Sequence, residues 1–158
     1  MSTKAAVHPT LLAILFGGFV AGTLDIGAAA LINFISPIPV LRFIAGGLLG
    51  RPALSGGASI VLLGLVLQWV MSLLIAAPFV LACRWLPILQ RRWIVSGLAY
   101  GVVIFFVMNY VVMPLSAWSK APSFTAEKFA ENMLAMLLFG LIISYFARRI
   151  DSNQTGGR

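Results

Sequence analysis

Charged residues are distributed so unevenly along the chain that they leave long apolar stretches between them. Residues 5–41 contain one charged side chain, that of Asp25, and residues 52–83 and 93–119 contain none. A fourth apolar stretch, residues 132–147, is slightly shorter. A helix needs roughly 20 residues to cross about 30 Å of hydrocarbon. We therefore predict four membrane-spanning helices, at about 11–33, 59–82, 93–113 and 128–147.

The composition supports this interpretation and excludes other classes of protein. Of the 158 residues, 61% are apolar and 9% are charged, against roughly a quarter charged in an ordinary soluble domain. A chain of this length cannot bury so much apolar surface within itself, which excludes a soluble enzyme and a disordered tail. Segments in lipid must pair their own backbone groups, and the alternating pattern of strands is absent. The sequence predicts an all-α membrane protein: one integral membrane domain over residues 1–158, folded as a four-helix transmembrane bundle.

A long apolar outer loop joins the first two predicted spans. This loop, residues 34–58, is too short to cross the bilayer yet contains many aliphatic side chains. Because Arg42 and Arg51 can extend to lipid headgroups, we expect an interfacial helix near residues 38–50. A re-entrant loop is the alternative.

The other two connections contain residues that end or begin helices. The short segment 83–92 makes spans two and three antiparallel neighbours, and Pro87 is expected to break the helix there. The second outer connection, residues 114–125, carries aromatic and basic side chains suited to the membrane interface. Ser123 or Thr125 can cap the fourth helix.

Basic residues lie at the ends of the predicted spans, where they set orientation in the membrane. Seven Lys and Arg residues fall on the side of the two termini, and four fall on the other side. The positive-inside rule then places both termini in the cytoplasm. The net charge of +7 therefore indicates topology and no nucleic-acid partner. Lys4, the apolar run and residues 28–30 also fit a cleaved secretory signal, an alternative that the acid at position 25 disfavours.

All four predicted spans carry small or polar residues about four positions apart, a spacing that places them on one helix face. In chain order they are Gly18, Gly22, Asp25, Ala29 and Asn33; Gly64, Gln68, Ser72 and Ala76; Gly97, Gly101 and Asn109; and Asn132, Met136, Gly140 and Ser144. Lipid offers no hydrophobic drive for helix association, so close packing and interhelical hydrogen bonds must supply it. We expect these faces to meet within the bundle, and spare glycine faces to join one copy to another. The glycines expected to pack are Gly18, Gly22, Gly97, Gly101 and Gly140.

The polar members of these faces fall at similar depths. On a rise of 1.5 Å per residue, Asp25 lies about 12 Å and Gln68 about 14 Å from the outer end of its span. Asn109 and Asn132 lie about 6 Å from theirs, one layer further out. We therefore predict an outward-opening pocket with Asp25, Gln68, Asn109, Asn132 and Ser72 as its ligand candidates.

Asp25 is the residue on which a functional hypothesis depends. An acid in the middle of a span costs about 2.5 to 3.5 kcal/mol on insertion scales, so such an acid normally faces protein or water. One interpretation makes it polar glue between helices, and the other makes it a site for a proton, a cation or a substrate. The three amides, taken one by one, are more typical of packing than of ligand binding.

Several kinds of chemistry have no residues to support them. The chain has one histidine, His8, outside the spans, and one cysteine, Cys83, which excludes a histidine-based metal site, a bis-histidine haem, a catalytic triad and an internal disulfide. The glycine pairs at 46–47 and 56–57 lack the spacing of nucleotide-binding loops. We predict no catalytic residue, no metal and no cofactor, and hence no enzyme.

Two segments resemble a bacterial family. Residues 18–27, GFVAGTLDIG, and residues 108–116, MNYVVMPLS, are similar to stretches from uncharacterised inner-membrane proteins of the YagU-like group. The resemblance implies a small polytopic protein of the bacterial inner membrane. The family supplies no established reaction, so no catalytic residue is transferred to this chain.

Three functional hypotheses follow from these patterns. The leading one is a non-enzymatic four-span protein whose outward-facing polar pocket around Asp25 handles a proton, a cation or a small solute. Because four short helices rarely enclose a complete pathway, this hypothesis expects a homo-oligomer or a larger membrane complex. The alternative is an accessory or scaffold subunit without a transport role. A weaker alternative is lipid or quinone binding by the outer loop through Arg42 or Arg51.

Overall fold

The computed structural model describes residues 9–119 and 125–155, with side chains as far as Arg149. Four helices in these ranges are long and apolar enough to cross a membrane, which confirms the prediction from the charge pattern. No strand occurs among the described residues. The candidate spans are α1 (Pro9–Ile32), α3 (Ala58–Trp85), a continuous helix made of α5 (Trp93–Val107), η2 (Met108–Val112) and α6 (Met113–Leu115), and α7 (Ala126–Thr155).

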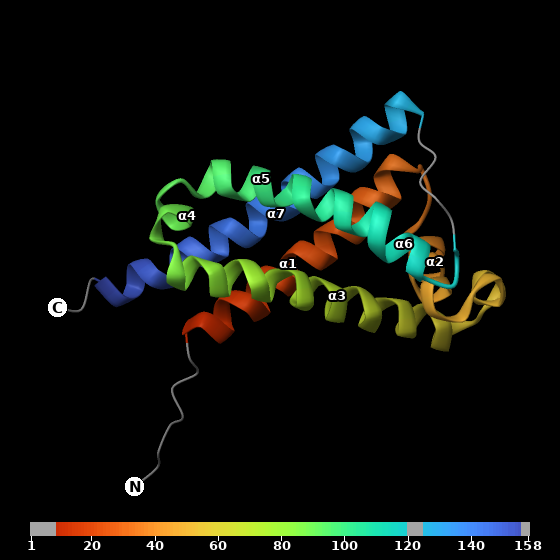
Figure 1. Ribbon diagram of the computed structural model, residues 1–158. Coiled ribbons are helices and arrows are strands. Elements are labelled where there is room, and N and C mark those ends of the chain that lie inside the picture. Colours follow the sequence, from red (N-terminus) through yellow and green to blue (C-terminus); the bar gives the residue numbers. More distant parts are fainter. Residues whose placement is uncertain (1–8, 120–124, 156–158) are drawn as a thin grey trace, which may run out of the picture.

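Short helical elements connect the spans at the two ends of the bundle (Figure 1). One end carries α2 (Pro37–Leu49) and η1 (Arg51–Ser55), and the other carries α4 (Pro87–Arg91). We call them the α2 end and the α4 end. The helix expected near residues 38–50 is therefore present as α2. Pro87 starts α4 directly after α3 has ended, as its missing N–H and fixed φ require.

The fourth span begins with the expected cap. The backbone N–H of Lys128 donates to Oγ1 of Thr125 at 3.3 Å, which satisfies one of the free donors of the first turn of α7. Glu127 adds a negative charge at the same helix end, where the helix dipole favours it. Ser123, the other candidate cap, lies outside the described residues.

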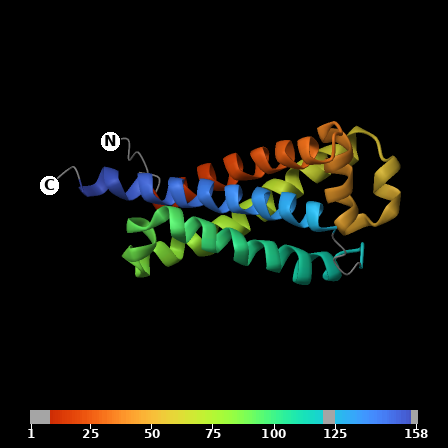
Figure 2. The ribbon, with the colours of Figure 1, turned by 90° about the horizontal axis from the view of Figure 1, so that it is seen from above.

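Helix α7 lies between α1 and α5 and runs antiparallel to both, while α3 packs on α1 (Figures 1 and 2). Spans two and three are antiparallel, but α5 packs most closely on α7, and Tyr100 reaches from α5 to α3. The Tyr100 hydroxyl donates to the carbonyl oxygen of Ile75 at 2.5 Å, and its ring lies 4.8 Å from that of Phe79. The short connection places α3 and α5 next to each other in the chain, but α5 makes its most extensive contact with α7.

Glycines explain why α5 prefers α7. A Cβ atom on Gly101 would lie 2.5 Å from the carbonyl oxygen of Met136, and one on Gly97 would lie 2.9 Å from Cβ of Ser144. From the other side, a Cβ on Gly140 would meet the carbonyl oxygen of Gly97. The backbones approach so closely here that only glycine fits, the arrangement by which small residues drive helix association in lipid.

The predicted packing glycines are therefore used inside one chain. Gly18 and Gly22 face α3, and Gly97, Gly101 and Gly140 join α5 to α7. The expectation that spare glycine faces join one copy to another is wrong for these five positions, because their surfaces are already covered.

The core is concentrated in the middle of the bundle and in its α4 half. Its buried members are Ala13, Ala21, Ala76, Phe79, Val80, Cys83, Ile104, Phe139, Ile143 and Ala147. The outward faces of the spans carry large apolar side chains, such as Leu74 and Leu134, with 63% and 60% of their surface exposed. An apolar exterior of this extent requires an apolar solvent. The four helices therefore indicate a membrane protein.

Candidate functional site

Asp25 and Gln68 meet between α1 and α3, in the half of the bundle nearer the α2 end. Nε2 of Gln68 donates to Oδ2 of Asp25 at 2.8 Å, and lies 3.4 Å from the carbonyl oxygen of Gly22. Both side chains are half-buried. The acid therefore faces a protein partner at its own depth, as the rise per residue predicts.

Small residues bring the two helices close enough for this contact. A Cβ on Gly18 would lie 2.7 Å from Cδ2 of Leu73, and one on Gly22 would meet Oγ of Ser72. Ser72 is 1% exposed and donates to the carbonyl oxygen of Gln68 at 2.8 Å. Ser72 is thus a packing residue in this close contact between α1 and α3, which we call the glycine seam. Asp25 and Gln68 bond to each other beside it.

The two predicted asparagines bond to their own helices. Nδ2 of Asn109 donates to the carbonyl oxygen of Phe105 at 2.8 Å, and Nδ2 of Asn132 donates to that of Lys128 at 2.9 Å. Each bond reaches back four residues, a local alternative to interhelical pairing. Of the predicted pocket residues, the structure joins Asp25 to Gln68 by a side-chain hydrogen bond. It leaves both asparagines half-buried, Asn109 on η2 and Asn132 on α7.

Asn109 lies in a local π-helix, which the sequence pattern does not predict. Over Met108–Val112 the helix widens, and the N–H of Met113 donates to the carbonyl oxygen of Met108, five residues back. Pro114 supplies a physical reason, because its ring displaces the carbonyl four residues earlier, at Tyr110, and it has no N–H to offer that carbonyl. Single π-helical turns are frequent at functional sites.

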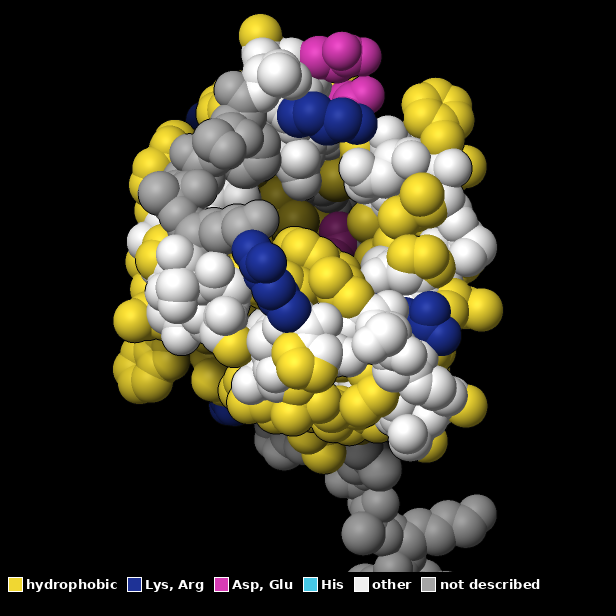
Figure 3. Space-filling view, turned by 90° about the vertical axis from the view of Figure 1, so that its right-hand side faces the viewer, with side chains coloured by type: hydrophobic (Ala, Val, Ile, Leu, Met, Phe, Trp, Pro, Cys, Tyr) yellow, Lys and Arg dark blue, Asp and Glu magenta, His cyan; other side chains and the backbone are white. Residues whose placement is uncertain are grey.

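The surface at the α2 end is hollowed between the helix ends. Figure 3 looks onto this end and shows an acidic side chain at the bottom of the hollow, with apolar and basic side chains around it. The described basic residues of this end are Arg42, Arg51 and Lys128. The main buried cluster lies in the middle and the α4 half of the bundle, away from this hollow.

Lys128 and Arg42 hold different positions at this end. Nζ of Lys128 lies 2.8 Å from Oε2 of Glu131 and donates to the carbonyl oxygen of Ile32 at 3.0 Å, so it ties α7 to the end of α1. Nε of Arg42 is buried and donates no hydrogen bond to a described residue. The sequence does not predict the contact of Lys128 with Ile32; it shows only that Lys128 lies in the first turn of α7.

Trp118 fixes α2 against the segment that follows α6. Its indole N–H donates to the carbonyl oxygen of Phe43 at 3.1 Å, and its ring stacks on that of Phe43 with centroids 4.7 Å apart. A Cβ on Gly46 would meet the same indole ring, and the N–H of Ala117 donates to the carbonyl oxygen of Gly47 at 2.8 Å. Gly46 thus allows close packing of an aromatic ring.

The described residues contain no group of three His, Cys, Asp or Glu side chains that could hold a metal ion. Comparison of the chain with protein-family models, with curated proteins and with solved structures finds no match. The class that the fold defines is an integral membrane protein with four candidate spans. The resemblance to the YagU-like group stays a prediction from the two sequence segments.

Proposed function

We propose that the protein is a non-enzymatic integral protein of the bacterial inner membrane whose polar pocket around Asp25 takes up a proton, a cation or another small solute. The observation that carries the proposal is the Asp25–Gln68 hydrogen bond inside a candidate span. An ionisable residue at such a depth is costly, and in membrane proteins it commonly marks an ion, proton or substrate pathway.

The geometry of Asp25 supports a site that is open to a ligand. Among the described residues Gln68 is its one side-chain hydrogen-bond partner, and it holds Oδ2. Asp25 as a residue is half-buried and keeps part of its surface exposed. Oδ1 is then available to a solute that enters from the hollow at the α2 end (Figure 3).

The distribution of arginines supports an orientation. The α4 end carries Arg84, Arg91, Arg92, Arg148 and Arg149, and the α2 end carries Arg42, Arg51 and Lys128 among the described residues. By the positive-inside rule we propose that the α4 end lies in the cytoplasm and that the hollow opens to the outer side.

A complete pathway requires more than one copy of this chain or a larger complex, because four helices enclose little space. Since the five packing glycines are covered, the assembly contacts we propose run through exposed aliphatic side chains of the outer faces. The alternative is an accessory subunit without a transport role. The observation that favours it is that Gln68 already gives Asp25 a partner inside the fold.

The proposal is tested by flux into liposomes that contain the purified protein. A potassium gradient with valinomycin imposes a voltage, and trapped dyes report proton and sodium entry in parallel. We expect entry of one of the two ions above the level of empty vesicles, loss of that entry in Asp25→Asn, and partial retention in Asp25→Glu.

Asn33→Ala is the matched control. Asn33 directly follows the same helix, is exposed, and donates to the carbonyl oxygen of Ala29 in the last turn of that helix. Its removal is expected to leave the flux unchanged. Equal flux in wild type and Asp25→Asn, or no flux of either ion in the wild type, would overturn a proton or sodium pathway through Asp25 and favour the accessory subunit.

A further inference from the structure

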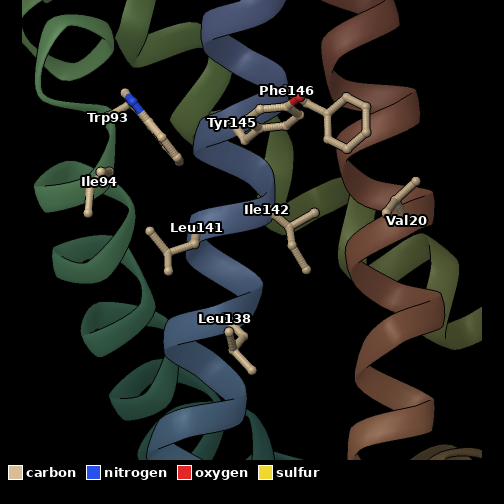
Figure 4. A pocket seen from close by; sticks show the side chains of 8 residues that line it. All are labelled: Val20, Trp93, Ile94, Leu138, Leu141, Ile142, Tyr145 and Phe146. Atoms are coloured by element: carbon tan, nitrogen blue, oxygen red, sulfur yellow. The ribbon is translucent and has the colours of Figure 1, made fainter.

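A second recess lies on the outward face of α7, away from Asp25. Its volume is about 380 Å³, within the range of ligand sites. Figure 4 shows α7 between α5 and α1, with the labelled side chains of all three helices lining a groove that runs along α7. The lining residues are Val20 from α1, Trp93 and Ile94 from α5, and Leu138, Leu141, Ile142, Tyr145 and Phe146 from α7.

The groove spans the depth of one leaflet. The candidate span in α7 is Ala126–Arg149, so its midpoint falls at about Leu138, where the groove begins. From Leu138 to Arg148 the helix rises about 15 Å, half of the roughly 30 Å of a hydrocarbon core. The groove therefore runs from the middle of the membrane to the headgroup level at the α4 end.

Arginines and aromatic rings meet where the groove reaches that level. The guanidinium of Arg148 lies 5.6 Å from the centre of the Trp93 ring, and that of Arg149 lies 5.1 Å from the centre of the Tyr145 ring. The Trp93 and Tyr145 rings contact each other edge to face, with centroids 5.9 Å apart. A hydrogen bond of 2.6 Å from Ser144 Oγ to the carbonyl oxygen of Trp93 fixes the start of α5 beside them.

We propose that this groove, the α7 groove, binds one acyl chain of an anionic phospholipid whose phosphate lies against Arg148. The lining is almost entirely apolar, as an acyl chain requires. The described side chains of the α4 end include arginines and no Asp or Glu, so an anionic headgroup complements their charge. Basic residues beside apolar clefts at one membrane face are a known mode of headgroup binding.

A second copy of the chain fits the groove less well. A symmetric contact through this face would bring the arginines of both copies together, and like charges at a contact oppose association. An anionic lipid instead removes that repulsion. The inference is independent of the Asp25 pocket, which lies nearer the opposite end of the bundle.

Native mass spectrometry of the purified full-length protein in mild detergent tests the inference. Phosphatidylglycerol and phosphatidylcholine with the same acyl chains are added at equal concentration. We expect phosphatidylglycerol to be retained preferentially, as one bound molecule per chain, and Arg148→Gln to weaken its binding about fivefold. Leu141→Trp fills the groove and is expected to abolish retention of both lipids.

Arg84→Gln is the matched control, since Arg84 is exposed at the same end but lies on α3, outside the lining. The Arg148→Gln variant leaves the core untouched, so its result stands even if Leu141→Trp fails to fold. Equal retention of the two lipids, or equal weakening by Arg84→Gln and Arg148→Gln, would overturn the inference. A dimer that Leu141→Trp dissociates would do so too, by making a second copy the occupant.

Discussion

The amide of Gln68 donates to the carboxyl of Asp25 at 2.8 Å, although the two residues are 43 positions apart in the chain. The contact depends on Gly18 and Gly22, which let α3 approach α1 closely. It therefore couples the glycine seam to the polar end of the bundle. Any substitution that widens the seam also separates this pair.

The pair is expected to contribute measurably to stability. Gln68→Leu removes the partner of Asp25, and hydrogen bonds between membrane helices contribute about 0.6 kcal/mol on average and about 1.7 kcal/mol at most. We expect the free energy of unfolding, measured by titration with a denaturing detergent, to decrease by an amount within that range. A double-mutant cycle with Asp25→Leu isolates the pairwise part.

Asn132→Leu provides the comparison for the same cycle. Because Asn132 bonds to its own helix, its coupling to Asp25 is expected to be near zero. Coupling of Asn132 to Asp25 as strong as that of Gln68 would contradict the assignment of the pair.

Gly140→Ala is expected to destabilise the bundle by about 1 to 3 kcal/mol, the usual cost of overpacking. The added methyl group meets the Gly97 carbonyl oxygen and lies 2.7 Å from the Gly101 nitrogen, and these backbone atoms can give way only if α5 and α7 separate. Gly27→Ala is the matched control, since a Cβ there has no neighbour within 4 Å. It is expected to raise stability by up to about 1 kcal/mol. Equal losses in both variants would show that the close contact at Gly140 does not set the effect.

Trp118→Ala is expected to release α2 from the rest of the α2 end. The substitution removes a ring stack and a hydrogen bond to Phe43, together about 1 to 3 kcal/mol. Amide hydrogen exchange in α2 should accelerate while that of α5 and α7 stays unchanged. Trp85→Ala, at a position that is 84% exposed, should leave exchange in α2 as it is. Unaltered exchange in α2 after loss of Trp118 would mean that other contacts hold it.

The spans and their ends could be predicted from the sequence because charge is so costly in lipid. Gaps between charged residues locate all four helices, and Pro87 and Thr125 mark a helix boundary and a cap by local chemistry alone. The common depth of Asp25 and Gln68 followed from the constant rise of a helix.

Partner choice could not be predicted in the same way. Glycine spacing marks a packing face, but only the folded backbone shows that Gly97 and Gly101 meet α7. An asparagine in a helix can bond to a neighbouring helix or to a backbone carbonyl of its own helix. Asn109 and Asn132 each donate to the carbonyl oxygen four residues earlier. The α7 groove depends on how far α1 and α5 diverge, which no local pattern records.

The even number of candidate spans among the described residues has a practical consequence for topology experiments. The helix that opens the described chain and the helix that closes it reach the same face of the bundle (Figure 1). If all four spans cross the membrane, reporters placed directly before α1 and directly after α7 must then indicate the same compartment. A single such measurement also assigns the hollow of the α2 end and the arginines of the α4 end each to its own aqueous phase.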